Sequence, residues 1–433
     1  MVSPTPRDES QKKRRALAII YLNPQMQVEM KVKKVLTYLL LTIVTLLLTL
    51  FITYWIAPDW VEDIAVDILY PTVTIEDEYI NTVSLEIPKV YELMYIACSL
   101  TETFKQDENF ISKRTPKYYA DVQNHFGSYD QHPLVTLLED KLKNNAYSQV
   151  QPAIRLFALN YDLEQDNSLK ENEIFHVNPL LIKLFKSKIF YYPDYKAQIE
   201  DFAKKTNFHQ FYTDHNQHYN LLKIKYLKLC NIDRMWTWME DRFPEKYDSY
   251  RIIFSPLTGG FHNTLPGLQD PISNLKQTWM FVSPPSKTNL DTLSQEELEV
   301  LSSKVEREVF TEIDHNYVNP ISDKYRTKIE EAIPDYRQWN HQKNGYRSSM
   351  STFNEYMTWA IFSLYALENY QPEQIEKILS VQEAFMVERR KFIHFKTFNR
   401  ELIRLYEDQR AKTGKIELET LYSPILKWME KKR

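Results

Sequence analysis

The hydrophobic and polar positions of residues 295–318 repeat with the period of an amphipathic helix. The apolar side chains recur at three- and four-residue steps and are Leu298, Leu301, Val305 and Val309. Ser294 with Glu297 three residues later forms an N-terminal capping pattern, and the segment ends before Asn319-Pro320. The pattern therefore predicts a helix whose apolar stripe faces a core.

Glu312 continues this apolar stripe, and His315 lies three residues further along on the same side of the predicted helix. Because an unpaired buried carboxylate is costly, Glu312 is expected to be protonated, paired with a cation, or bound to a metal ion or its water. Each alternative predicts a polar pocket. A structural Glu–His pair near a helix end and a metal site both remain open at this point.

Two further segments place reactive side chains where elements begin or end. The helix predicted over residues 353–369 is apolar on nearly every side, and Glu355 lies at its start, where it either serves a site or complements the helix dipole. A short apolar strand leads into Gly259-Gly260, two of only six glycines in the chain. His262 follows directly, which makes it a candidate metal ligand as well as a possible ordinary loop residue.

The remaining periodicity predicts a mainly α-helical fold with a small β-sheet. Residues 58–87 alternate apolar and polar side chains and predict one or two short strands, and a small sheet is expected near Phe254. The scarcity of glycine, against a usual share of roughly 7%, favours helices. The predicted helices are residues 89–104, 133–146, 149–160, 178–187, 195–204, 217–241, 295–318, 353–369, 372–410 and 415–431. No linker divides them, so one body of the α+β class is expected.

Residues 36–57 carry no charge and are long enough to cross a bilayer as one transmembrane helix. Basic side chains precede this segment and acidic ones follow it, so the positive-inside rule places the N-terminus in the cytosol and residues 58–433 outside. No small-x-small cleavage site follows the apolar run, which favours an anchor over a cleaved signal peptide. We expect a single-pass protein of the cell membrane that contacts the lipid bilayer through residues 36–57.

The charges of the chain also divide at this segment. Residues 1–35 hold eight basic and three acidic side chains, which leaves 46 basic and 55 acidic side chains in the exported part. This acidic balance offers no footprint for nucleic acid. Residues 1–29 are either a disordered part of the cytosolic tail or lie upstream of a natural start at Met30.

Two smaller features leave alternatives open. Cys98 and Cys230 are the only cysteines, and they either form a disulfide on the oxidising side of the membrane or remain buried thiols. His215 and His218 form an H-x-x-H pair that fits either a metal site or the polar entry to a surface helix.

A family resemblance is carried by three stretches, which are Val90 to Thr101, Ser255 to Thr264, and Thr311 to Pro320 taken with Asn354-Glu355-Tyr356. Together they resemble an uncharacterised bacterial family of exported domains that is itself similar to gluzincin zinc metallopeptidases. The resemblance spans most of residues 76 to 400. It implies a gluzincin-like fold around a degenerate H-E-x-x-H motif, in which Thr311 replaces the first His.

Carried over by position, the resemblance implies Glu312 as the catalytic general base and His315 and Glu355 as zinc ligands. No residue inherits the remaining ligand position, because a Thr hydroxyl is a poor zinc ligand compared with imidazole. His262 is the preferred substitute. Asp314 is the alternative, although it points about 100° away from His315 on the same helix.

Two functions follow from different classes. The first is a membrane-anchored extracytoplasmic peptidase in which Glu312 activates a zinc-bound water. The second is a catalytically inactive gluzincin-like domain that binds a peptide or a glycan at the cell envelope, with Glu312 and His315 kept as a structural pair.

Overall fold

A computed structural model of the chain describes residues 71–432 apart from 145–146, 178–194, Phe261, 286–288, 342–344 and Lys415, together with four single residues before them. Residues 71–433 form one compact unit. The predicted anchor at 36–57 lies almost entirely outside the described residues, as does the helix predicted at 178–187. Among the helices that are described, none is long and apolar enough to cross a membrane.

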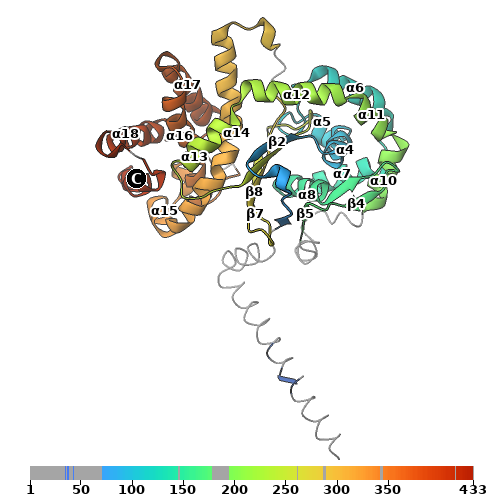
Figure 1. The fold of residues 1–433 in the computed structure, drawn as a ribbon, viewed down its shortest axis with the longest axis horizontal. Coiled ribbons are helices and arrows are strands. Elements are labelled where there is room, and N and C mark those ends of the chain that lie inside the picture. Colours follow the sequence, from blue (N-terminus) through green and yellow to red (C-terminus); the bar gives the residue numbers. More distant parts are fainter. Residues whose placement is uncertain are drawn as a thin grey trace, which may run out of the picture. The chain divides into compact units, whose positions relative to one another are not determined.

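The described unit is mainly helical with a small mixed sheet, as predicted (Figure 1). The sheet contains strands β2 (Thr82–Glu86), β6 (Ser249–Ile253), β8 (Lys276–Phe281) and β7 (Asn263–Gln269), in that order. The first three strands are parallel, and β7 pairs with β8 in the antiparallel sense. Two short antiparallel pairs join β1 (Thr72–Val73) to β5 (Phe175–His176) and β3 (Tyr161–Leu163) to β4 (Leu169–Glu171).

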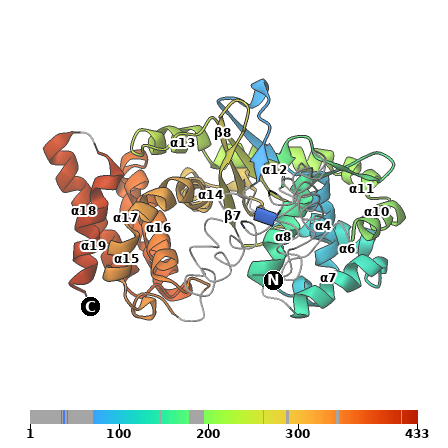
Figure 2. The ribbon, with the colours of Figure 1, turned by 90° about the horizontal axis from the view of Figure 1, so that it is seen from below.

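The helices form two groups on either side of the four-stranded sheet (Figure 2). The first group is α4 (Lys89–Ser99), α5 (Glu102–Lys105), α6 (Pro116–Phe126), α7 (Pro133–Asn144), α8 (Tyr147–Asn160), α10 (Lys196–Lys205), α11 (Phe208–Asp214) and α12 (Asn216–Leu229). The second is α13 (Ile232–Glu240), α14 (Gln295–Lys324), α15 (Arg326–Ala332), α16 (Ser349–Asn369), α17 (Pro372–Ala384), α18 (Phe395–Thr413) and α19 (Tyr422–Glu430). Helix α14 joins the groups, because it packs on α12, α13, α16, β7 and β8.

Helix α14 begins as predicted, with a capping box in which Ser294 and Glu297 exchange side-chain to backbone hydrogen bonds. Its predicted end is wrong, because the helix continues through Pro320 to Lys324. Proline cannot donate to the carbonyl four residues earlier, which belongs to Asn316. The Tyr247 hydroxyl donates to that carbonyl instead, at 2.9 Å, so the lost hydrogen bond is replaced from the loop between α13 and β6.

Other boundaries also differ from the prediction. The helix predicted over 217–241 is broken between α12 and α13, and the one predicted over 372–410 is broken after α17 by a π-turn at Phe385–Arg389. Lys391, at φ 61°, follows that turn in the left-handed region, which no continuous helix allows. Helices α6, α11 and α15 were not predicted.

The predicted start of α16 at residue 353 is also wrong, because the helix begins at Ser349. Ser348 and Ser351 form its capping box, so Glu355 lies in the second turn rather than at the start and has no capping role. Cys98 and Cys230 are both buried and free, which decides the cysteine alternative in favour of thiols.

Gly259 lies where two backbone segments touch. Its N–H donates to the Phe110 carbonyl at 2.9 Å, and a Cβ at this position would overlap the backbone of Asn109 and Phe110. The close approach expected at the Gly-Gly turn is therefore confirmed. A Cβ added at Gly260 would have no neighbouring atom closer than 3.9 Å.

We therefore expect Gly259→Ala to lower the free energy of unfolding by about 3 kcal/mol, because backbone atoms cannot yield as a flexible side chain can. Gly260→Ala is the matched control and should change it by less than about 0.5 kcal/mol. Chemical denaturation of the two variants measures both values. Equal stabilities would contradict the close packing of this turn.

Candidate functional site

A cleft of about 1290 Å³ contains all four predicted site residues. Its walls are formed by α14, α16, the loop before α6, the Gly259-Gly260 turn and the π-turn after α17. The titratable side chains that line it include His262, Glu308, Glu312, His315, Glu355 and Arg390. Sequence and structure therefore place the candidate chemistry in one cavity, although the residues have different partners from those a zinc site requires.

Glu355 binds two cations, one through each carboxylate oxygen. Its Oε1 lies 3.3 Å from Nε2 of His315, and its Oε2 accepts a hydrogen bond from Nη1 of Arg390 at 2.7 Å. Burial by itself raises the pKa of Glu355, but Arg390 and His315 more than offset this and lower it to about 2. Glu355 is therefore an anion whose two oxygens are both engaged.

The guanidinium of Arg390 also contacts two aromatic side chains. Its Nη2 donates to the Tyr346 hydroxyl at 2.6 Å, and its guanidinium lies 4.9 Å from the centre of the Trp359 ring. These contacts fix the guanidinium against Glu355, because each direction of the planar group is used.

His315 is a cation in this arrangement. Burial by itself lowers its pKa, but the hydrogen bond and charge of Glu355 and the charge of Glu312 raise it to about 9. Its Nδ1 faces Oδ1 of Asn319 at 3.4 Å, so both ring nitrogens have acceptors. An imidazolium has no free lone pair and cannot ligate a metal without losing a proton.

Glu312 is buried, as its place on the apolar stripe predicted, with 9% of its surface exposed. Burial raises its pKa to about 7, although the charge of His315 acts in the opposite direction. In the described part of the chain, no side chain donates a hydrogen bond to its carboxylate. Glu312 can therefore exchange a proton near neutral pH, which is what a general acid or base requires.

His262, the preferred substitute ligand, lines the cleft, but its side chain is hydrogen-bonded to the residues that hold the Gly259-Gly260 turn. Its Nε2 lies 2.7 Å from Oγ of Ser283, and that hydroxyl donates to the Gly259 carbonyl. Burial lowers the pKa of His262 to about 4, so the ring is neutral. Asp314, the alternative, is fully buried away from the cleft, and burial raises its pKa far above the usual range.

The residues present do not fit a zinc ion. Among the described residues, no group of three or more His, Cys, Asp or Glu side chains is arranged to hold a metal. The Thr311 hydroxyl donates to the Arg307 carbonyl at 3.0 Å, within its own helix. Arg390 also brings a positive charge to Glu355, where a divalent cation would be repelled.

Two ionic elements of the cleft were not predicted. Arg390, directly after the π-turn, binds Glu355, and Arg114 binds Glu308 with both Nη atoms at 2.9 and 3.1 Å. The sequence shows the Arg389-Arg390 doublet, but a continuous helix was predicted over 372–410. Without the π-turn, the direction of the Arg390 side chain toward Glu355 could not be predicted. Glu308 lies one turn before Glu312 on α14, and that spacing was the available signal.

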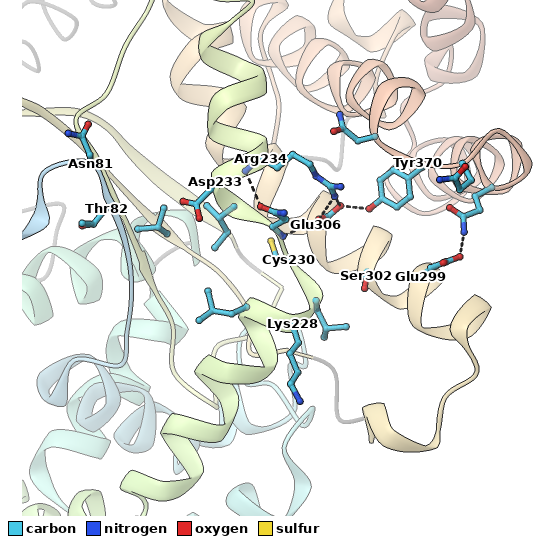
Figure 3. Close-up of a pocket in the computed structure, with 18 residues that line it drawn as sticks. Asn81, Thr82, Lys228, Cys230, Asp233, Arg234, Glu299, Ser302, Glu306 and Tyr370 are labelled. Atoms are coloured by element: carbon cyan, nitrogen blue, oxygen red, sulfur yellow. Dashed lines mark hydrogen bonds and ion pairs between the residues drawn. The ribbon is translucent and has the colours of Figure 1, made fainter.

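A second pocket of about 800 Å³ lies between α12, α13 and the start of α14 (Figure 3). Its buried Glu306 accepts from Arg234 Nη2 at 3.0 Å and from the Asn231 backbone N–H at 3.1 Å, and it also bonds the Tyr370 hydroxyl. Because these groups satisfy one another, we place the candidate site in the cleft rather than here. His215 and His218, the H-x-x-H pair, lie against the Tyr118 ring, in neither cavity.

Comparison with protein-family models, with curated proteins and with solved structures finds no match for this chain. The resemblance to gluzincin-like exported domains therefore stays a prediction, which depends on the motif residues named above.

The raised pKa of Glu312 predicts a pH-dependent effect of Glu312→Gln. A carboxyl whose pKa rises to about 7 on folding contributes stability that is full below about pH 4.5 and is lost as the pH rises through 7. The glutamine has no such loss. The unfolding free energy of the variant minus that of the wild type should therefore rise by roughly 2 kcal/mol between pH 5 and pH 8. Urea unfolding at both pH values measures this gain.

Glu388→Gln, at an exposed position on the π-turn after α17, is the control and should differ from the wild type equally at both pH values. A Glu312→Gln difference that does not change with pH would contradict the proton held at Glu312.

Proposed function

We propose that this chain is a metal-free, gluzincin-like domain whose cleft binds a peptide and does not hydrolyse it. The observation that supports this most is the double engagement of Glu355, whose oxygens contact His315 at 3.3 Å and Arg390 at 2.7 Å. A guanidinium takes the place that a divalent cation needs, and a protonated imidazole takes the place of a ligand. The alternative, a zinc-dependent peptidase, is supported only by Glu312. Its pKa of about 7 suits a general base.

The aromatic side chains of the cleft favour a peptide over a glycan. Sugars stack on open aromatic faces, but each described aromatic ring that lines this cleft has a guanidinium near it. Arg390 lies 5.2 Å from the Tyr346 ring centre, and Arg307 lies 5.3 and 5.5 Å from those of Trp359 and Phe385. Cations held on these faces instead suit a ligand with backbone carbonyls and carboxylates.

The proposed setting is the outer face of the cell membrane. The charge-free segment at 36–57 and the change from basic to acidic side chains across it support this orientation. The domain would then present its cleft to peptides of the cell envelope while remaining attached to the bilayer.

Metal analysis of the full-length chain, purified without chelator, tests the proposal. We expect well under one zinc per chain, no rise in melting temperature with added Zn²⁺, and no peptide hydrolysis. The double variant Thr311→His with Arg390→Gln is the positive control, because it restores an imidazole and frees Glu355, and it should gain zinc. One tightly held zinc in the wild type, with peptide hydrolysis that Glu312→Gln abolishes, would overturn the proposal.

A further inference from the structure

Arg307 is a buried cation that lines the cleft and has no hydrogen-bonding partner. Its side chain is 5% exposed, and its Nε is buried without an acceptor. Throughout the described residues, no N–H group of its guanidinium donates a hydrogen bond and no carboxylate pairs with it. Buried guanidinium groups are almost always paired, so this one is set for an acceptor that the chain itself does not supply.

The neighbours of Arg307 hold it in place without using its N–H groups. The guanidinium lies 5.3 Å from the centre of the Trp359 ring and 5.5 Å from that of Phe385. The nearest carboxylate by charge, Glu308, is taken by Arg114. Burial lowers the pKa of Arg307, the charge of Glu308 acts in the opposite direction, and Arg390, which binds Glu355, adds a second positive charge that lowers it. The site therefore combines a fixed guanidinium with an excess of positive charge.

An apolar groove of about 610 Å³ opens beside Arg307, between the start of α14 and α17. Its apolar lining is Leu293, Val300, Leu301, Ile378 and Val381. Val300 and Val381, which both line this groove, are 39% and 52% exposed. Leu301, Lys304, Arg307 and Val381 line both this groove and the cleft, so two cations lie where the polar and apolar cavities meet.

We propose that this junction binds a carboxylate that carries an apolar group on its neighbouring carbon, as at the C-terminus of a peptide with an apolar last residue. The carboxylate accepts hydrogen bonds from Arg307 and forms an ion pair with Lys304, while the apolar side chain enters the groove. The inference rests on the proposed peptide-binding function and names the ligand end that the cleft selects. A fatty acid shares this chemistry and is distinguished by the test.

The probes are N-acetyl-Ala-Leu with a free carboxylate, its C-terminal amide, N-acetyl-Ala-Gly, and octanoate. Each is titrated calorimetrically into the full-length chain in lipid nanodiscs, with empty nanodiscs as the blank. We expect the Leu carboxylate to bind at least tenfold more tightly than its amide and at least threefold more tightly than the Gly peptide. Octanoate is expected to bind more weakly than the Leu peptide.

Four variants separate a binding role from a structural one. Arg307→Met should reduce the carboxylate-to-amide ratio to within twofold and leave the melting temperature unchanged or raised, because it removes an unpaired buried charge. The Lys304 side chain is exposed, and Lys304→Gln should weaken binding of the carboxylate probe about threefold. Val381→Ser should remove the preference for Leu over Gly. Arg404→Gln, an exposed charge change on α18, is the control and should alter no ratio.

Equal binding of carboxylate and amide, binding of neither, or an Arg307→Met variant with an unchanged ratio would overturn the inference. Tight binding of octanoate with no binding of the peptides would assign the junction to fatty acids instead. Zinc is measured in the same samples. A metal-free protein without carboxylate preference overturns this inference and leaves the metal-free domain standing, whereas stoichiometric zinc overturns the proposed function.

Discussion

The ion network of His315, Glu355 and Arg390 links three of the chain segments that line the cleft. Glu355 comes from α16, His315 from α14, and Arg390 directly follows the π-turn after α17. Glu355 is 4% exposed, so removal of either cation would leave a buried carboxylate with a single partner. Breaking such a buried pair typically costs about 3–5 kcal/mol, which is a large part of the stability of a domain. The relative positions of these three segments therefore depend on this contact.

The same network determines what chemistry the cleft can perform. With Glu355 neutralised from both sides, two titratable groups of the cleft have no hydrogen-bonding partner among the described side chains: Glu312, whose pKa is raised to about 7, and Arg307. Both are costly to bury, and neither is compensated within the described chain. Protein sites that carry such uncompensated groups are commonly those that meet a ligand, because stability is given up there for binding.

Local sequence patterns predicted the features that depend on neighbours along the chain. The capping box at Ser294 and Glu297 and the burial of Glu312 follow from helical spacing and were predicted correctly. The extension of α14 past Pro320 could not be predicted, because the hydroxyl that replaces the proline N–H belongs to Tyr247, 69 residues away from the carbonyl it bonds. Arg390 was missed because its direction depends on the π-turn, which the apolar pattern of residues 372–410 does not reveal.

The protonation state of His315 tests the ion network most directly. In a ¹⁵N-labelled full-length chain, with the signal assigned through His315→Gln, imidazole nitrogen shifts report whether each ring nitrogen carries a proton. We expect an imidazolium at pH 7.5 that titrates near pH 9 and does not change on addition of a chelator. A neutral His315 at pH 7.5, or a ring signal that shifts when the chelator is added, would contradict it.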